Sequence, residues 1–310
     1  MSVFNDDQLD VPRTSLSIEG IGTSKSCLIP EGAYGSSQTK FIPINSVEDA
    51  AELVKDWLVQ TASVSVEEIV GIGHRVVHGG ERFSRASLIN DELVNYLTEI
   101  TPLAPNHMPA TLAMVQAFRH TYPNTPHIAT FDTSFFHNIP EVAKTLPIPR
   151  NLQDKFNIHR YGFHGLSYQS LLDSFSRHEG SVAARGRVIM AHLGNGASVA
   201  ACINGEPLDM SMGFTPVSGI MMSTRSGDIE PGVLTYLQKT QGFSTDDISK
   251  LLTYESGLLG VSGFSADMHE LLMAEKLNKQ AELAINLFCY KIKKTIGAYT
   301  TVLGGVDSII

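Results

Sequence analysis

The chain has 310 residues, of which 43% are hydrophobic and 18% are charged, and its formal net charge is −9. This length allows two domains with cores of their own, and the composition is that of an ordinary globular protein. The negative charge argues against nucleic acid as a main partner, because such binding needs a basic surface, and no apolar run reaches the roughly 18 residues of a membrane-spanning helix.

The first residues, MSVFNDDQLD, lack the basic and apolar regions of a secretion signal, so the cytoplasm is the expected compartment. Cys27, Cys202 and Cys289 lie far apart in apolar or strand-like surroundings. That setting predicts small buried thiols rather than metal ligands or a disulfide framework.

The two ends of the chain indicate a fragment. Strand-like segments near residues 16–19 and 27–29 suggest that the chain begins inside a meander, and residues 304–310 are typical of a turn followed by a buried strand. A natural chain seldom stops in the middle of a strand. We therefore expect a truncated form of a longer protein.

The first half of the chain alternates helices and strands. A helix is expected after Ser46, because Ser46 with Asp49 three residues later resembles a capping box. A buried strand is expected at residues 69–73 and another at 127–131. Between them, residues 109–118 predict a helix with proline in its first turn.

The second half continues the same alternation after a linker near residues 136–150 that contains three prolines. Ser167 is the expected cap of one helix, and Ser244 with Asp247 caps another. Residues 278–299 predict a long amphipathic helix. Helices that alternate with strands indicate an α/β fold.

The linker divides the expected fold into two domains. Residues 1–136 would form an N-terminal α/β domain that lacks its first strand and its phosphate-binding loop, and residues 137–310 a C-terminal α/β domain that is incomplete at its end. One strand meander near the start and another after Arg187 suggest a duplicated plan, in which each domain begins with the same kind of sheet.

Residues 187–228 are unusually rich in residues that form turns. An apolar run at 188–191 stops at the sequence HLGNG, and a second run at 197–203 ends at Asn204-Gly205. Asn-Gly supplies the positive φ of a tight hairpin, so a meander is predicted. Its first turn, rich in backbone N–H groups, suits a phosphate; the alternative is an ordinary hairpin.

Three polar residues lie at strand ends or in glycine-flanked loops, where open α/β sheets bind ligands. Arg75 would hold a carboxylate or phosphate with its forked guanidinium, or pair with a surface acid. Asp132 would face a ligand or cap a helix that begins near Thr133. His164 would act in catalysis or form a structural hydrogen bond.

Arg225 is a fourth candidate. Small residues surround it in the segment STRSGD and leave its guanidinium free to project. This setting predicts an arginine that meets an anionic ligand, and the alternative is a salt bridge to Asp228.

Six segments, in this order, closely resemble the acetate kinase family, which comprises carboxylate kinases for acetate, propionate and butyrate. They are HRVVHGG at 74–80, LAPNHMP at 103–109, FDTSF at 131–135, RYGFHG at 160–165, HLGNGAS at 192–198 and SMGFTPVSGIMMSTRSGDIEPG at 211–232. The resemblance covers nearly the whole chain. It implies two duplicated ribonuclease H-like α/β domains, the fold shared by acetate and sugar kinases, the Hsp70 ATPase domain and actin.

The resemblance also implies a reaction. The γ-phosphoryl group of ATP would pass reversibly to a short carboxylate, acetate or propionate, to give an acyl phosphate and ADP, with Mg²⁺ as cofactor. Such a transfer needs positive charge around the phosphoryl oxygens more than covalent chemistry from the protein. The family also implies a homodimer in the cytoplasm.

The roles of individual residues follow from the same resemblance. Arg75 would hold the carboxylate, Asp132 would be the active-site acid, and His164 and Arg225 would stabilise the transferring group. Three residues would form the apolar wall around the acyl group: Val77, Phe163 and Pro216. The nucleotide would contact two stretches, His192, Leu193, Gly194, Asn195 and Gly196 for the phosphates and Asp267, Met268 and His269 near the adenosine.

The chain departs from the family pattern in several places. The family's serine-rich phosphate loop would lie before Met1, and its glycine-rich loop and magnesium-binding glutamate after Ile310, so no metal ligand is expected here. Leu166 and Tyr168 replace threonine and histidine. The remaining replacements are Asn106, Met108 and His269. The missing loops predict an inactive chain, so the alternative to an active kinase is a nucleotide-binding fragment or paralogue without turnover.

Overall fold

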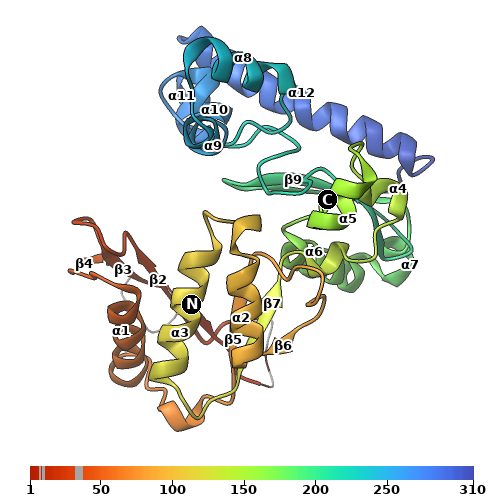
Figure 1. Cartoon of the computed structure of the whole chain (residues 1–310). Helices are drawn as coiled ribbons and strands as arrows, with labels where there is room; N and C mark the ends of the chain where they lie inside the picture. The colour runs from red at the N-terminus through yellow and green to blue at the C-terminus, as the bar shows by residue number, and fades with distance from the viewer. Residues whose placement is uncertain (7, 9–10, 32–37) are drawn as a thin grey trace. The chain divides into compact units, whose positions relative to one another are not determined.

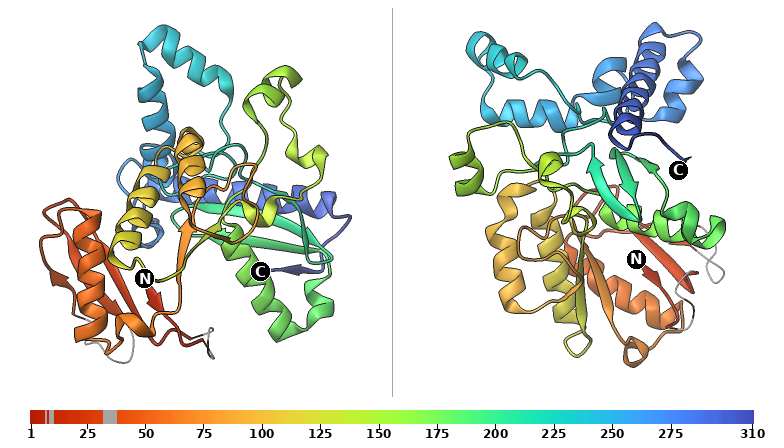
Figure 2. Two further views of the ribbon diagram at one scale, coloured as in Figure 1. Left: turned by 60° about the horizontal axis from the view of Figure 1, so that its bottom comes forward. Right: turned by 90° about the vertical axis from the view of Figure 1, so that its right-hand side faces the viewer.

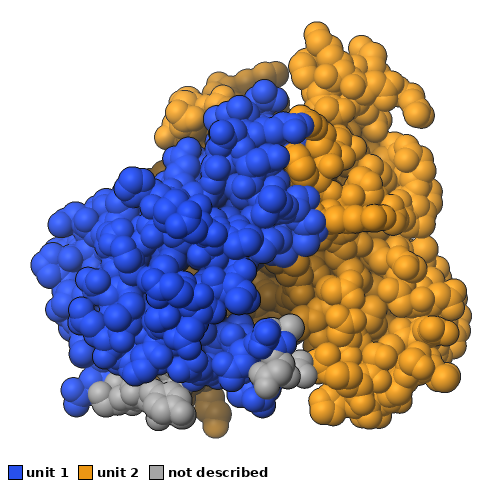
Figure 3. Space-filling view, turned by 90° about the horizontal axis from the view of Figure 1, so that it is seen from below, with its two compact units in different colours: residues 1–76, 86–101, 105–130 blue, residues 77–85, 102–104, 131–310 orange. Residues whose placement is uncertain are grey.

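A computed structural model describes residues 1–6, 8, 11–31 and 38–310 (Figure 1). These residues form both helices and strands, as two further views show (Figure 2). They form two compact units (Figure 3). Unit 1 comprises residues 1–76, 86–101 and 105–130, and unit 2 comprises residues 77–85, 102–104 and 131–310. The division into domains at residue 136 stays a prediction.

Unit 1 begins with an antiparallel meander of four strands, β1 (Ser2–Val3), β2 (Thr14–Glu19), β3 (Cys27–Glu31) and β4 (Lys40–Phe41). Helix α1 (Val47–Gln60) packs Val54, Trp57 and Leu58 on the sheet residues Leu16 and Leu28. The predicted start of this helix is confirmed, because the Asp49 N–H donates to the Ser46 hydroxyl at 3.0 Å.

A second sheet of unit 1 has the order β5 (Ile72–Val76), β7 (His127–Phe131) and β6 (Ser87–Leu88). Helix α3 (Met108–Thr121) packs on β5, on α1 and on α2 (Asp91–Glu99). The strand predicted at residues 69–73 is wrong in position. The chain forms a short 3-10 helix at Val66–Glu68 first, and Val70 is 78% exposed.

Unit 2 contains a sheet of order β10 (Glu206–Met210), β9 (Ala197–Ile203), β8 (Val188–Leu193) and β11 (Ser308–Ile309). The first three strands form the predicted antiparallel meander, and β11 runs parallel to β8. Strand β9 is buried from Ala197 to Cys202. It is covered by α12 (Lys279–Val302) and α6 (Gly165–Glu179), which Figure 1 shows above and below the sheet. This position explains why its sequence is apolar except at Ser198.

The remaining helices of unit 2 lie before β8 and after β10. They are α4 (Glu141–Lys144), α5 (Arg150–Phe156), α7 (Ser181–Ala184), α8 (Pro231–Gln241), α9 (Thr245–Tyr254), α10 (Gly257–Ser262) and α11 (Met268–Ala274), with short 3-10 helices at Thr101–Leu103 and Ser134–Phe136. Within the described part of the chain, no helix combines the length and apolar character needed to cross a bilayer.

The predicted helix ends have mixed outcomes. Ser244 and Asp247 form the expected capping box at the start of α9, and the predicted long helix is confirmed as α12, with Asn278 at its N-cap. Ser167 does not cap α6, because the helix starts at Gly165 and His164 is its N-cap. The prediction of buried cysteines holds for Cys27 and Cys202, whereas Cys289 is exposed.

Candidate active site

The two Asn-Gly turns of the unit 2 meander differ in backbone conformation. Asn204 and Gly205 have φ angles of 57° and 81°, as a tight hairpin requires. The positive φ predicted at the first turn is wrong, since neither Asn195 nor Gly196 has one. Gly196 is small for another reason, because a Cβ atom there would lie 3.1 Å from His164 Nε2 and 3.5 Å from Arg225 Nη1.

His164 is held in a strained loop conformation at the start of α6. Its φ is 62°, in the left-handed region that few side chains adopt, and the residue is 9% exposed. The next residue, Gly165, donates its N–H to the Asp132 carbonyl at 2.8 Å, and a Cβ on Gly165 would collide with that carbonyl. The loop that carries His164 is thereby fixed against the residue that follows β7.

A polar network surrounds the two histidines of the site. The His164 and His192 rings stack with centroids 4.2 Å apart. His164 Nδ1 lies 2.9 Å from the Ser198 hydroxyl, and Ser198 also contacts the Tyr168 hydroxyl at 2.7 Å. Ser167 approaches His192 Nδ1 at 2.9 Å. Hydrogen bonds on Nδ1 decide which ring nitrogen carries the proton.

The loop that carries Arg225 is closed by hydrogen bonds between Gly219 and Asp228. The N–H of Gly219 donates to the Asp228 carboxylate at 2.8 Å, and the Asp228 N–H donates back to the Gly219 carbonyl at 2.8 Å. Arg225 donates from Nη1 to the Pro216 carbonyl at 3.0 Å. Burial lowers the pKa of Arg225, which remains charged at neutral pH.

The loop that carries Arg225 also contacts the glycine turn, Gly194-Asn195-Gly196, between β8 and β9. The Ser223 N–H donates to the Asn195 carbonyl at 3.2 Å, and the two side chains meet at 3.4 Å. The turn between β8 and β9 is therefore tied to the loop that presents Arg225. His164, Gly196 and Arg225 come together from three separate segments of unit 2.

Asp132 is the buried carboxylate next to this group of residues. It is 2% exposed, and Thr133 beside it accepts a hydrogen bond from the Gly79 N–H at 3.1 Å. The 3-10 helix that follows has Thr133, not Asp132, at its N-cap position. The cap alternative for Asp132 is therefore wrong.

The three residues predicted to form an apolar wall are in unit 2. Phe163 is fully buried, Val77 packs on the same core, and Pro216 is buried. The ring of His78, which follows Val77, lies edge-on to Phe163 with centroids 5.6 Å apart.

The other predicted residues belong to different elements. Arg75 is an exposed residue of β5 and belongs to unit 1. Asp267 is the N-cap of α11, where it accepts the Glu270 N–H at 2.9 Å. Met268 packs on the core formed by α10, α11 and α12, while Asp267 and His269 are exposed. Leu193 and Gly194 are exposed at the end of β8.

Comparison with known proteins gives the family. A sequence model described as the acetokinase family matches residues 2–310. The chain belongs to the acetate kinase family. Among similar curated proteins, the acetate kinase of Geobacillus sp. (strain WCH70) is 42% identical over 87% of this chain and 68% of its own length. That of Bacillus subtilis (strain 168) is 39% identical over 94% of this chain and 74% of its own.

Solved structures of acetate kinase family members have the same fold. The crystal structure of Porphyromonas gingivalis acetate kinase matches 96% of this chain and 76% of its own with a TM-score of 0.87 and 38% identity. A propionate kinase from Francisella tularensis subsp. tularensis SCHU S4 matches the same shares with a TM-score of 0.90 and 34% identity. The fold class is therefore the α/β fold of acetate and sugar kinases, Hsp70 and actin, as predicted, and nothing in the comparisons supports an inactive chain.

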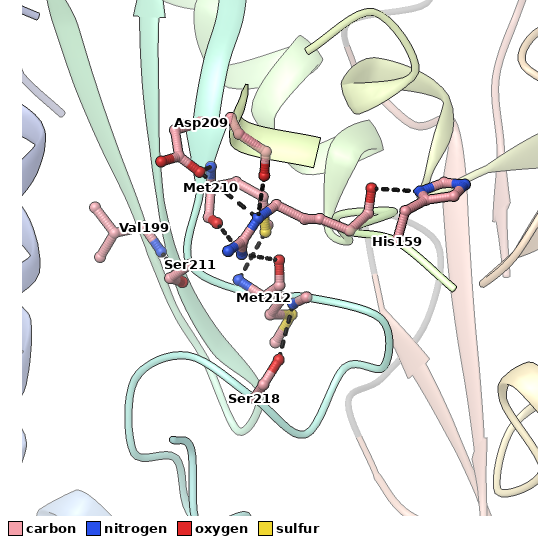
Figure 4. A network of polar contacts seen from close by, with 10 residues as sticks. His159, Val199, Asp209, Met210, Ser211, Met212 and Ser218 are labelled. Carbon is pink, nitrogen blue, oxygen red and sulfur yellow. Dashed lines mark hydrogen bonds and ion pairs between the residues drawn. The ribbon is translucent and has the colours of Figure 1, made fainter. Parts of the chain in front are cut away.

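Arg160 is a structural residue of this acetate kinase family member that sequence reasoning missed. Its guanidinium donates to the carbonyls of Met210 at 2.7 Å and Met212 at 2.8 Å and approaches Asp209 at 3.8 Å. Figure 4 shows the labelled acceptors at the end of β10. Arg160 fixes the segment that leads to Phe163 and His164. Arg160 is the first residue of the motif RYGFHG, and this position marked it as a residue of interest. The motif did not show whether its side chain stabilises the fold or contacts a ligand.

Tyr168 and Ser198 were also missed as site residues, although the chain's departure from the family pattern at Tyr168 was visible in the sequence. Both are fully buried and hydrogen-bonded beside His164. The signal for Ser198 was a hydroxyl in an otherwise apolar buried strand. A buried hydroxyl in such a strand needs a partner, and here the partners are Tyr168 and His164 of the candidate site.

Proposed function

We propose that this chain is a carboxylate kinase that transfers the γ-phosphoryl group of ATP reversibly to acetate or propionate, giving an acyl phosphate and ADP. The observation that carries this proposal is the approach of His164 Nε2 and the Arg225 guanidinium to Gly196. A hydrogen-bond donor and a cation face a backbone that has no side chain in the way. Phosphoryl transfer depends on such preorganised positive groups around the equatorial oxygens.

The glycine turn would hold the phosphates of the nucleotide. His192, Leu193, Gly194, Asn195 and Gly196 end β8 and lead into β9. The lack of a side chain at Gly196 lets His164 Nε2 and Arg225 Nη1 come close to this turn, because a Cβ there would lie 3.1 Å and 3.5 Å from them. His164 and Arg225 would then stabilise the group in transfer. Asp132, buried next to the loop of His164, would be the active-site acid.

The acceptor would be held by charge at one end and by apolar contacts at the other. Arg75 would bind the carboxylate through its forked guanidinium. Val77, Phe163 and Pro216 would receive the methyl or ethyl group. Each methylene in such a pocket changes selectivity by only about 1–3 kcal/mol, so acetate and propionate are both proposed as substrates.

Asp267, Met268 and His269 would lie near the adenosine. The resemblance supports this assignment, as does the exposure of Asp267 and His269 at the start of α11. ATP would supply the phosphoryl group, and ADP would remain after transfer.

Mg²⁺ would neutralise charge on the phosphates when bound. Its ligands in proteins are usually one or two carboxylates together with phosphate oxygens. Among the residues that the structure describes, no three histidine, cysteine or acidic side chains gather as in a metal site. We therefore assign no residue to the ion.

The proposed setting is that of a small-molecule enzyme in the cytoplasm that forms a homodimer, with no nucleic acid and no membrane as partner. The net charge of −9 supports the absence of nucleic acid. The exposed apolar residues Leu283, Tyr290 and Val302 on α12 support a further contact of that helix.

The test is acyl phosphate formation by the purified chain with ATP, Mg²⁺ and either acetate or propionate, trapped with hydroxylamine. Arg225→Ala should lower kcat about 100- to 1,000-fold, because it removes a cation from the transition state. Arg119→Ala is the matched control, since Arg119 pairs with the exposed Asp91 on the surface. A chain that gives no acyl phosphate at any substrate concentration would support the inactive alternative.

A further inference from the structure

The hydrogen bonds of the polar network beside His164 run in one direction from donor to acceptor. Tyr168 and Ser198 are fully buried, and both hydroxyls need partners for their hydrogens. The Tyr168 hydroxyl lies 2.7 Å from the Ser198 hydroxyl. Ser198 in turn lies 2.9 Å from His164 Nδ1.

Only one arrangement satisfies the hydroxyl hydrogens of both Tyr168 and Ser198 with the partners they have in the described part of the chain. If Ser198 donated to Tyr168, the phenol hydrogen would need another acceptor, and the described residues offer it none. A buried donor without an acceptor costs about 1–3 kcal/mol. Tyr168 therefore donates to Ser198, and Ser198 donates to His164 Nδ1.

A histidine that accepts at Nδ1 carries its hydrogen on Nε2 when it is neutral. Nε2 is the nitrogen that faces Gly196, since it would lie 3.1 Å from a Cβ atom there. The stacked ring of His192, 4.2 Å away between centroids, limits rotation of the His164 ring.

We infer that Tyr168 and Ser198 are positioning residues that hold His164 as the Nε2–H tautomer, so that this N–H donates to an oxygen of the transferring phosphoryl group. The inference rests on the proposed function for the identity of the acceptor. Tyr168 stands where the family pattern has histidine, so this chain sets the tautomer with a phenol and a serine.

The first test is the tautomer itself, measured by ¹⁵N NMR of histidine-labelled protein without ligand at pH 7. The His164→Asn variant identifies the His164 signals by their loss. The wild-type chain should show a protonated Nε2 and an unprotonated Nδ1. Tyr168→Phe and Ser198→Ala should each give a mixture of tautomers, because Ser198 becomes free to accept or is absent.

Two control variants separate this effect from general damage to the fold. Tyr122→Phe removes another buried tyrosine hydroxyl, one without a hydrogen-bond partner among the described residues. Ser26→Ala removes a buried serine that donates to the Ile42 carbonyl and accepts the Ile44 N–H in unit 1. Neither should change the tautomer of His164.

The second test is kinetic. Tyr168→Phe and Ser198→Ala should lower kcat about 10- to 100-fold, as loss of a positioning partner does elsewhere. KM for the carboxylate should change less than about twofold, because an interaction made mainly in the transition state is lost.

The two tests distinguish the inference from the proposed function. A wild-type His164 with its proton on Nδ1, or a tautomer unchanged in both variants, would overturn the inference even if the chain is an active kinase. The expected tautomer and its dependence on Tyr168, in a chain without kinase activity, would uphold the positioning and overturn the role toward the phosphoryl group.

Discussion

At Gly196 the lack of a side chain lets His164 and Arg225 come close to the backbone. Its backbone has no positive φ, so the residue type is not explained by turn geometry. Its would-be Cβ meets a histidine nitrogen and an arginine nitrogen. Gly205, in the next turn, is the opposite case, because its φ is 81° and the space around its would-be Cβ is open. Both glycines follow an asparagine, but Gly196 is required for space and Gly205 for its backbone conformation.

This contrast predicts two separate outcomes. Gly196→Ala should lower kcat at least about tenfold while changing the free energy of unfolding by less than about 1 kcal/mol, since the new methyl group would displace only the ends of the His164 and Arg225 side chains. Gly205→Ala should cost about 1 kcal/mol of stability through its left-handed backbone and leave kcat intact. Steady-state kinetics and urea unfolding of both variants measure this. Equal activity in the two variants would contradict it.

At the scale of the elements, two buried histidines join β5 to β7 inside unit 1. His127 Nε2 donates to the Tyr122 carbonyl at 3.1 Å, so its Nδ1 accepts from His74 Nε2 at 2.9 Å. Burial first, and then the neighbouring His127, lower the pKa of His74 to about 4.

The pair predicts acid sensitivity of unit 1. The unfolded chain binds a proton at His74 near pH 6.5 and the folded chain only near pH 4, so its contribution is complete above pH 6.5 and is lost as the pH falls to 4. We expect a loss of about 1–3 kcal/mol in unfolding free energy across that window. Urea unfolding at several pH values measures it, and His74→Asn should flatten the curve. A His74 NMR titration with a midpoint near 6.5 would refute the prediction.

A second element-scale contact is the ion pair that holds the segment after β5. Glu81 lies in residues 77–85 of unit 2, contacts His159 by a short hydrogen bond, and approaches Lys144 at 4.0 Å. The hydrogen bond from His159 is the main reason that the pKa of Glu81 falls to about 2. Because the Glu81 side chain is 38% exposed, solvent screens much of this interaction.

Glu81→Gln should therefore cost about 1 kcal/mol of stability at pH 7. The contribution is present above the ordinary glutamate pKa of 4.5 and is lost as the pH falls through about 2, so wild type and variant should converge in strong acid. Thermal unfolding across this pH range gives the comparison. Asp154→Asn, which breaks an exposed pair with Arg150, is the control and should have a smaller effect. A constant difference at every pH would argue against the ion pair.

At the scale of the whole chain, the last residues complete the sheet of unit 2. Ile310 accepts the Ala191 N–H at 2.7 Å and donates to the Ile189 carbonyl at 2.9 Å. Arg187 binds Asp307 through its guanidinium and through its backbone N–H, at 2.5 Å and 2.8 Å. These contacts join segments 120 residues apart and fix where β11 begins.

Asp307→Asn should loosen β11 without unfolding the rest of unit 2. The hydrogen bond from Arg187 lowers the pKa of Asp307 to about 2, so the contact persists above pH 3.8 and is lost as the pH falls through 2. At pH 7 we expect faster amide exchange at Ala191 and Ile310 in the variant, measured by hydrogen–deuterium exchange. Glu255→Gln, which removes the partner of Lys250, should leave that exchange unchanged. Unaltered exchange in both variants would show that the strand is held by its backbone alone.

The sequence predicted most of the elements that have strong local signals. The meander of β8, β9 and β10 was readable from two apolar runs with Asn-Gly turns, α9 from its capping residues, and α12 from its amphipathic pattern. The strand before Arg75 was placed too early, because the apolar residues 69–71 resemble a buried strand but precede it. The start of α6 was also misplaced, since a histidine with a positive φ is an N-cap that no propensity favours.

The sequence by itself determined the family and the residue types of the site, because motifs such as RYGFHG and HLGNGAS are local strings. It did not determine why those residues meet. That depends on contacts between distant segments, such as Gly196 against His164 and Arg225, and Ser198 against Tyr168. Only the tertiary structure decided which glycine needs space, which arginine serves the fold, and which nitrogen of His164 carries the proton. Each of these properties depends on a contact between two groups. The spacing of residues along the sequence does not show which groups are in contact.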